Sequence, residues 1–301
     1  MDRRNIGFSL VEMLISMLCV VIIMIALYDV FSKQTKINTA EQGILDMQMN
    51  ARMAIERLNF LFAHAGYGCS ESFATGRYLD GIGPDGDSIN IKSSISNVVN
   101  KRPENGSDSV VISFGFRKIG ELDSIPSEKE VDIKNKEGPR IETGENFKKY
   151  ISFYPDLSGD VFYEVVSGDD PYELNAEIED KVKKSDTDIF MVVPVNIAIE
   201  NETLKFKNYV YDSGKWDIAK NVENLQLQYS SDGETWNDVP DEPQKVQAVR
   251  AFLLCRSSYK DLGYTNTKEY TLGNETVGPY NDSYHRTVVR TTVWIRSAER
   301  Q

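Results

Sequence analysis

The sequence predicts an α+β protein, in which one long N-terminal helix, first transmembrane and then amphipathic, packs on an antiparallel β-sheet head. Three observations predict this. An apolar block covers residues 8–27, apolar residues then recur at helical spacing to about residue 65, and short alternating strands fill the rest of the 301 residues. Because the remaining chain is polar, we expect a soluble head held on an anchor.

Composition excludes several classes of function. Lys and Arg number 34 against 46 Asp and Glu, which gives a net charge of -12. Since phosphate contacts need a basic face, and no basic stripe with interleaved aromatics is present, we expect no nucleic acid contact. The acidic surface is typical of a head that must stay soluble.

The sequence predicts neither a metal site nor a catalytic site. Its three cysteines and two histidines, His64 and His285, form no CxxC or HxxxH spacing. Acidic turns at residues 83–88 and 232–234 lack the spacing of a calcium loop. No nucleophile elbow, P-loop or dinucleotide fingerprint occurs. We therefore expect no enzyme and no cofactor, with both histidines structural or solvated.

The apolar block is long enough to cross a bilayer. Its 20 residues span about 30 Å as a helix. Arg3 and Arg4 precede it, so the positive-inside rule puts the N-terminus in the cytoplasm and the head outside. The chain after Leu27 offers no small-x-small cleavage site, and a plain signal anchor leaves Glu12 unexplained. Residues 8–30 are thus the predicted transmembrane half of the helix.

Residues 7–12, Gly-Phe-Ser-Leu-Val-Glu, resemble the type III leader of type IV prepilins and type II secretion pseudopilins. The resemblance implies that residues 1–7 are a leader, that a prepilin peptidase cuts after Gly7, and that Phe8 is then N-methylated. Glu12 becomes the fifth residue of the mature chain. Many major pilins of the family carry a proline late in the apolar block. This chain differs from them, because residues 20–31 contain no proline.

A carboxylate at Glu12 is costly in hydrocarbon unless it is paired. Cleavage would create an ammonium group on Phe8, one helical turn away in the same chain or facing the Glu12 of a neighbour. Opposite charges attract strongly in a low dielectric. Glu12 is therefore predicted to set the register between packed subunits, the alternative being a polar residue that snorkels to the interface.

Residues 31–66 form the predicted amphipathic half of the helix, whose apolar stripe packs under the sheet. Gly66 and Gly68 end it. Residues 8–65 would be one helix of about 87 Å, with Gly43 as its weak point. The stripe consists of Ile37, Ile44, Met47, Ala51, Ala54, Ile55, Leu58, Leu61 and Phe62.

Residues 67–301 are the predicted β-rich head, without a βαβ rhythm or an internal repeat. Two segments rich in turn and charged residues, near 117–148 and 257–284, are predicted as exposed insertions. Strands are expected at 88–91, 109–114, 150–154, 161–166, 189–199, 203–211, 225–229, 246–254 and 287–296.

Stretches at both ends of the head resemble minor pilins of the PilW type. Residues 52–69 close an Ala/Leu-rich helix on Ala-Gly-Tyr-Gly-Cys, and residues 246–257 carry the strand Ala-Val-Arg-Ala-Phe-Leu-Leu-Cys-Arg-Ser. Pseudopilins of the GspJ type share part of this pattern, notably the Val-Arg strand after a turn that contains Trp236. Further stretches with the same resemblance are 105–112, 222–229 and 286–296.

The resemblance implies a single-pass inner-membrane subunit with an extracytoplasmic head. Such a subunit joins other minor pilins through its N-terminal helix and serves the priming or tip complex of a type IV pilus, in adhesion, twitching motility or DNA uptake. Two alternatives stay open. One is a type II secretion pseudopilin of the GspJ type, and the other is a membrane-anchored extracytoplasmic binding domain.

Cys19 lies in the apolar block, so Cys69 and Cys255 are the only cysteines outside it. In an oxidising exterior they could pair, and a bridge across so long a loop would contribute about 3–5 kcal/mol in the chain-entropy model. The alternative is two separate buried thiols.

Overall fold

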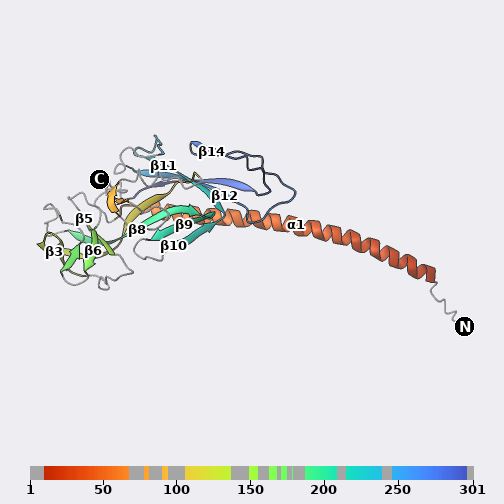
Figure 1. The fold of residues 1–301 in the computed structure, drawn as a ribbon, viewed down its shortest axis with the longest axis horizontal. Coiled ribbons are helices and arrows are strands. Elements are labelled where there is room, and N and C mark those ends of the chain that lie inside the picture. Colours follow the sequence, from red (N-terminus) through yellow and green to blue (C-terminus); the bar gives the residue numbers. More distant parts are fainter. Residues whose placement is uncertain are drawn as a thin grey trace, which may run out of the picture.

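The computed structural model describes residues 10–67, 78–80, 90–93, 106–136, 149–154, 163–167, 171–174, 178, 187–208, 215–238 and 246–296. A single helix, α1 (Leu10–Ala63), leaves the β-rich head as a long rod, and the head sits on its C-terminal half (Figure 1). The strands are β1 Tyr78–Asp80, β2 Asn90–Ser93, β3 Val110–Ser127, β4 Glu130–Lys134, β5 Lys149–Tyr154, β6 Tyr163–Ser167, β7 Tyr172–Leu174, β8 Asp188–Glu200, β9 Thr203–Asn208, β10 Lys215–Lys220, β11 Val222–Ser230, β12 Ala248–Arg256, β13 Tyr270–Leu272, β14 Glu275–Val277 and β15 Arg286–Trp294.

The helix is continuous over 54 residues, or about 81 Å. Its burial begins only at Ala40, and from there the predicted apolar stripe turns toward the sheet. The helix ends at Ala63, and Gly66 follows with a φ of 71°, a left-handed conformation that favours glycine. The prediction of one helix that is half bare and half packed under a sheet is confirmed, although Ile37 stays exposed.

Every strand pairing in the described part of the chain is antiparallel, as predicted. One sheet has three strands in the order β11–β12–β15. Alternate side chains of this sheet face α1 and share one apolar core with it. Members of this core include Met47, Ala51, Leu58, Phe62, Leu225, Leu227, Val249, Leu253 and Val293.

The larger sheet closes on itself. Its order is β10–β9–β8–β3–β4–β7–β6–β5, and β5 also pairs with β8, so six strands from β8 round to β5 form a small barrel. The barrel has its own apolar interior, which includes Leu122, Val131, Phe153, Tyr163 and Ile189. Figure 1 shows β3, β5 and β6 at the end of the head farthest from the helix N-terminus.

The prediction that residues 117–148 form an exposed insertion is wrong for the residues that the structure describes. The long strand β3 and strand β4 pair as a hairpin, and Ile119, Leu122, Val131 and Ile133 are at most 6% exposed. The charged residues between them point outward. Because these charges are many, the alternation of apolar and charged residues was interpreted as a loop instead of a strand. Residues 137–148 lie outside the described part.

The predicted insertion at 257–284 is only partly exposed. It contains the short hairpin of β13 and β14, whose Tyr270 and Leu272 cover Phe252 and Leu254 on the outer face of the three-stranded sheet. The segment also contacts the helix at Gly43. A Cβ on Gly43 would lie 3.1 Å from the backbone nitrogen of Tyr259, so this glycine allows a close approach and is buried. Gly43 was predicted to be a weak point of the helix, but in the structure it is a site of contact between the helix and the head.

The segment before β3 joins the two sheets. The N–H of Asp108 donates to the carbonyl of Leu225 (2.7 Å), and the N–H of Leu227 donates to the Asp108 carboxylate (2.8 Å). The N–H of Leu225 donates to the Ser107 hydroxyl (3.1 Å). Both Ser107 and Asp108 are buried. This segment therefore closes the free edge of β11 with hydrogen bonds that another strand would otherwise make.

Candidate functional site: the N-terminal helix and the head region that holds it

In the described part of the chain, the first part of α1 is not buried against the head. Every large apolar side chain described between Leu10 and Phe31 is exposed, and this helix is long and apolar enough to cross a membrane. Between Leu10 and Phe31 the only charged residues are Glu12 near the start and Asp29 near the end. The segment between them has 16 residues, or about 24 Å of uncharged helix.

Glu12 lies exposed in the first turn of the described helix. At the other end of the apolar stretch, Asp29 forms an ion pair of 2.8 Å with Lys33, one turn farther along and also exposed. Gly7 and Phe8 lie outside the described residues. The geometry therefore places Glu12 on an open helix surface, where another chain can reach it, and leaves its predicted pairing with Phe8 as a prediction.

The second half of α1 is held by the C-terminal strand. The Thr291 hydroxyl of β15 donates to the Asn59 side-chain oxygen (2.7 Å), and the N–H of Arg296 donates to the carbonyl of Ala63 (3.1 Å). Leu58 and Phe62 are fully buried between these contacts. Strand β15 and Arg296 thus hold the C-terminal end of α1 in place. This fixes the direction in which the exposed N-terminal half of α1 extends from the head.

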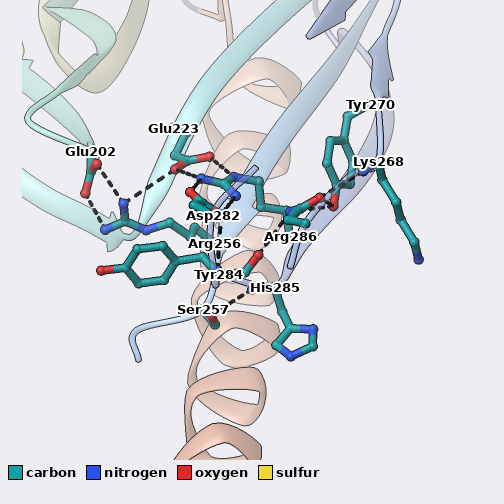
Figure 2. A network of polar contacts seen from close by, with 11 residues as sticks. Glu202, Glu223, Arg256, Ser257, Lys268, Tyr270, Asp282, Tyr284, His285 and Arg286 are labelled. Carbon is teal, nitrogen blue, oxygen red and sulfur yellow. Dashed lines mark hydrogen bonds and ion pairs between the residues drawn. The ribbon is translucent and has the colours of Figure 1, made fainter. Parts of the chain in front are cut away.

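A buried arginine network stabilises the other end of the same sheet (Figure 2). Arg286 is 2% exposed and donates to Glu223 at 2.6 and 2.9 Å and to Asp282 at 2.7 and 2.7 Å. Its guanidinium lies 3.8 Å from the centre of the Tyr280 ring. Burial alone would lower the pKa of Arg286, but the hydrogen bonds to Asp282 and Glu223 outweigh this and raise it.

Arg256 extends the network toward the larger sheet. It lies opposite Arg286 in the strand register and donates to Glu202 at 2.9 and 2.6 Å, while its ion pair with Glu223 spans 3.5 Å. Glu202 belongs to the turn between β8 and β9, so the network links both sheets. The bidentate arginines fix the geometry of the carboxylates as well as their charge.

Ser257, His285 and Asp261 lie close together but do not form a catalytic triad. The Ser257 hydroxyl donates to the carbonyl of Tyr259 (2.9 Å) and accepts the backbone N–H of His285 (3.1 Å). The His285 ring instead contacts the Asp261 carboxylate (3.0 Å) and stacks on Tyr264. The hydrogen bond from His285 lowers the pKa of Asp261. These contacts anchor the loop before β15.

Sequence reasoning missed this network, because arginine and carboxylate residues far apart in the chain form no motif. The signal available was the charge in two stretches that otherwise read as strands, Arg256 at the end of one and Arg286 at the start of the other. Among the described residues, no three His, Cys, Asp or Glu side chains are grouped so as to hold a metal ion.

Cys255 is a free, fully buried thiol on the inner face of β12. Burial, followed by the Glu223 carboxylate, raises the pKa of this thiol to about 12. Cys255 lies opposite Thr287, whereas the helix end lies beside Arg296, about 30 Å farther along the strand direction. Cys69 is outside the described residues. The possible pairing of Cys255 with Cys69, and the alternative of two separate buried thiols, therefore stay predictions.

Two family profiles match the chain at these places. Residues 2–28 match the family described as the prokaryotic N-terminal methylation motif. Residues 202–297 match the family described as Type IV Pilus-assembly protein W. The second match begins at Glu202 and contains all of the arginine network and the strand that holds the helix end.

Other comparisons add little. No curated protein matches the chain. A type IV-like pilin from Thermus thermophilus aligns at 16% identity over 50% of this chain and 84% of its own, with a TM-score of 0.27, too low to carry an argument. The start of the chain is therefore similar to prokaryotic proteins with an N-terminal methylation motif, and the region that holds the helix is similar to the type IV pilus-assembly protein W family.

Proposed function

We propose that the chain, once cut after Gly7 and N-methylated at Phe8, enters a type IV pilus as a minor subunit in the complex that primes assembly or forms its tip. One observation carries this proposal. The match to the methylation motif at residues 2–28 includes the exposed start of α1, while the match to the PilW family at residues 202–297 includes the strand that holds the buried part of α1.

The bare helix supplies the means of assembly. Its apolar surface would first lie in the inner membrane, with the N-terminus cytoplasmic because of Arg3 and Arg4, and then pack against the helices of other pilins. In that packed environment the Phe8 ammonium and the Glu12 carboxylate of neighbouring chains stabilise each other, and this pair sets the register. Adhesion, twitching motility and DNA uptake are the processes that such a pilus serves.

The charge at Glu12 can be tested apart from processing. Replacement of Glu12 by alanine should leave cleavage after Gly7 intact and lower the recovery of the chain in sheared pili by about tenfold, because an unpaired Phe8 ammonium would be buried among helices. Recovery is measured by immunoblot of pilus and membrane fractions. Glu41, exposed on the same helix below the head, provides the control Glu41→Ala.

Equal recovery of Glu12→Ala and Glu41→Ala in pili would contradict the register role of Glu12. Recovery of the cleaved wild-type chain with secretion pseudopilins instead of pilus subunits would assign it to a pseudopilus, the alternative that its GspJ-like strand leaves open. The first result would overturn only the role of Glu12, whereas the second would change the assembly to which the chain is assigned.

A further inference from the structure

The two edges of the three-stranded sheet differ. The β11 edge is closed by residues 106–108, as described above. At the β15 edge, the bonds Ser257–His285 and Ile295–Gln247 fix which residues turn their backbone groups toward β12. These are the odd-numbered residues, so the N–H and C=O groups of the even-numbered residues point away from the sheet.

Among the described residues, the outward groups of β15 have no backbone partner along most of the strand. Arg296, just after it, donates to the end of α1, but within the part of the chain that the structure describes no backbone hydrogen bond reaches the outer edge from Val288 to Trp294. The register with β12 runs without a bulge, and Arg290, Thr292 and Trp294 are exposed. An unprotected edge of this kind is a template for another strand.

The residue types of β15 favour such pairing. Thr and Val make up six of the nine residues, with neither proline nor glycine to interrupt the edge. Natural edges are commonly protected by such interruptions or by bulges. The one protective feature on the exposed part of this edge is the charge of Arg290.

The charge of the edge indicates the partner. Arg290 is exposed and forms no ion pair with any described residue, and Arg250 on the same face lies 3.8 Å from the centre of the Trp236 ring. Two arginines that pair with no described carboxylate are unusual on a chain whose net charge is -12. A second copy is disfavoured, because antiparallel pairing of two β15 strands about Arg290 would set like charges opposite each other.

The edge also lies beside the helix. Thr291 contacts Asn59 of α1, and the next residue, Phe60, is 52% exposed. Phe60 continues an exposed apolar stripe at helical spacing that includes Leu45, Met49 and Met53. A chain that packs on this stripe would have its own residues close to the β15 edge.

We propose that the open edge of β15 binds an extended acidic segment of a neighbouring pilus subunit by strand addition. Backbone groups of Val288, Arg290, Thr292 and Trp294 would bond the added strand, and a carboxylate on its outer face would pair with Arg290. Side chains on its inner face would be apolar, since they lie next to α1. The source of the segment rests on the proposed function, whereas the edge and its charge preference do not.

The probe is a short fluorescent peptide that alternates glutamate with valine and threonine, titrated against the full chain in mild detergent and followed by anisotropy. Thr292→Pro removes one outward N–H and no backbone bond of the sheet, so it should weaken binding at least about tenfold; the contact of the Thr292 hydroxyl with Arg250 Nε is lost in this variant and in the control alike. The matched control Thr292→Ala keeps the N–H and should bind like wild type. Circular dichroism checks that both variants fold.

Charge reversal gives a second readout that does not need the proline. Arg290→Glu should lose the glutamate peptide and bind the same peptide with lysine in place of glutamate. Equal binding of both peptides by wild type, or equal binding by Thr292→Pro and Thr292→Ala, would overturn the proposal. So would self-association of the wild type that Thr292→Pro abolishes, because the occupant would then be a second copy. Cleavage after Gly7 in these variants reports on the proposed function separately.

Discussion

Replacement of Arg286 by alanine is expected to lower the free energy of unfolding of the head by about 3–5 kcal/mol. The side chain is 2% exposed and is held by two carboxylates, Glu223 and Asp282. Its removal leaves both acids with a cation missing in a mostly buried place, and that desolvation cost is larger than the net value of the pair itself. Urea unfolding of the full chain in mild detergent, followed by intrinsic fluorescence, measures the loss.

Arg256 provides the matched control. Its main partner, Glu202, is 49% exposed, so Arg256→Ala should cost about 1 kcal/mol or slightly more. Adding Glu223→Gln to Arg286→Ala should recover part of the lost stability, because one unpaired charge is removed. Equal losses for Arg286→Ala and Arg256→Ala would contradict the importance given to burial here.

Replacement of Phe62 by alanine is expected to cost about 3–5 kcal/mol and to loosen the helix from the sheet. Phe62 is fully buried in the core that α1 shares with β11, β12 and β15. The same substitution at Phe60, two residues earlier and 52% exposed, should change stability by no more than about 0.5 kcal/mol. The same urea unfolding experiment compares them.

Limited proteolysis adds a structural readout to this pair. If the C-terminal half of α1 is held as described, Phe62→Ala should expose the helix near Asn59 to proteases while Phe60→Ala should not. Similar protection and similar stability of the two variants would show that the helix does not depend on this core.

Much of the fold could be predicted from the sequence, because local patterns determined it. The helical spacing from Met47 to Phe62 and the alternation in β8 follow from burial on one face, and this burial is visible in the residue pattern of each segment. The β3–β4 hairpin was not predicted. Its outward face carries many charged residues and its inward face few apolar ones, so the strand alternation was not recognised.

Which strands and loops come together in the folded head could not be predicted from the sequence. Closure of the barrel depends on β5 meeting β8, and nothing in residues 149–154 states which strand they will join. The close approach of Tyr259 to Gly43 likewise depends on a distant loop. The arginine network arises because Arg256 and Arg286 become neighbours only when β12 and β15 pair.

The candidate site divides in the same way. The roles of Gly7, Phe8 and Glu12 are predicted from a short contiguous stretch of sequence, and they stay predictions. A pairing of Cys69 with Cys255 depends on a distance that the sequence does not contain, and because Cys69 lies outside the described residues the pairing stays a prediction.

The mass of the N-terminal peptide is the most direct test of the prepilin assignment. The full chain is expressed with and without a prepilin peptidase, and the purified protein is analysed by mass spectrometry, with Gly7→Val as an uncleavable control. We expect a chain that begins at methylated Phe8 only when the peptidase is present and Gly7 is intact. A chain that still begins at Met1 in the presence of active peptidase would contradict its assignment as a prepilin.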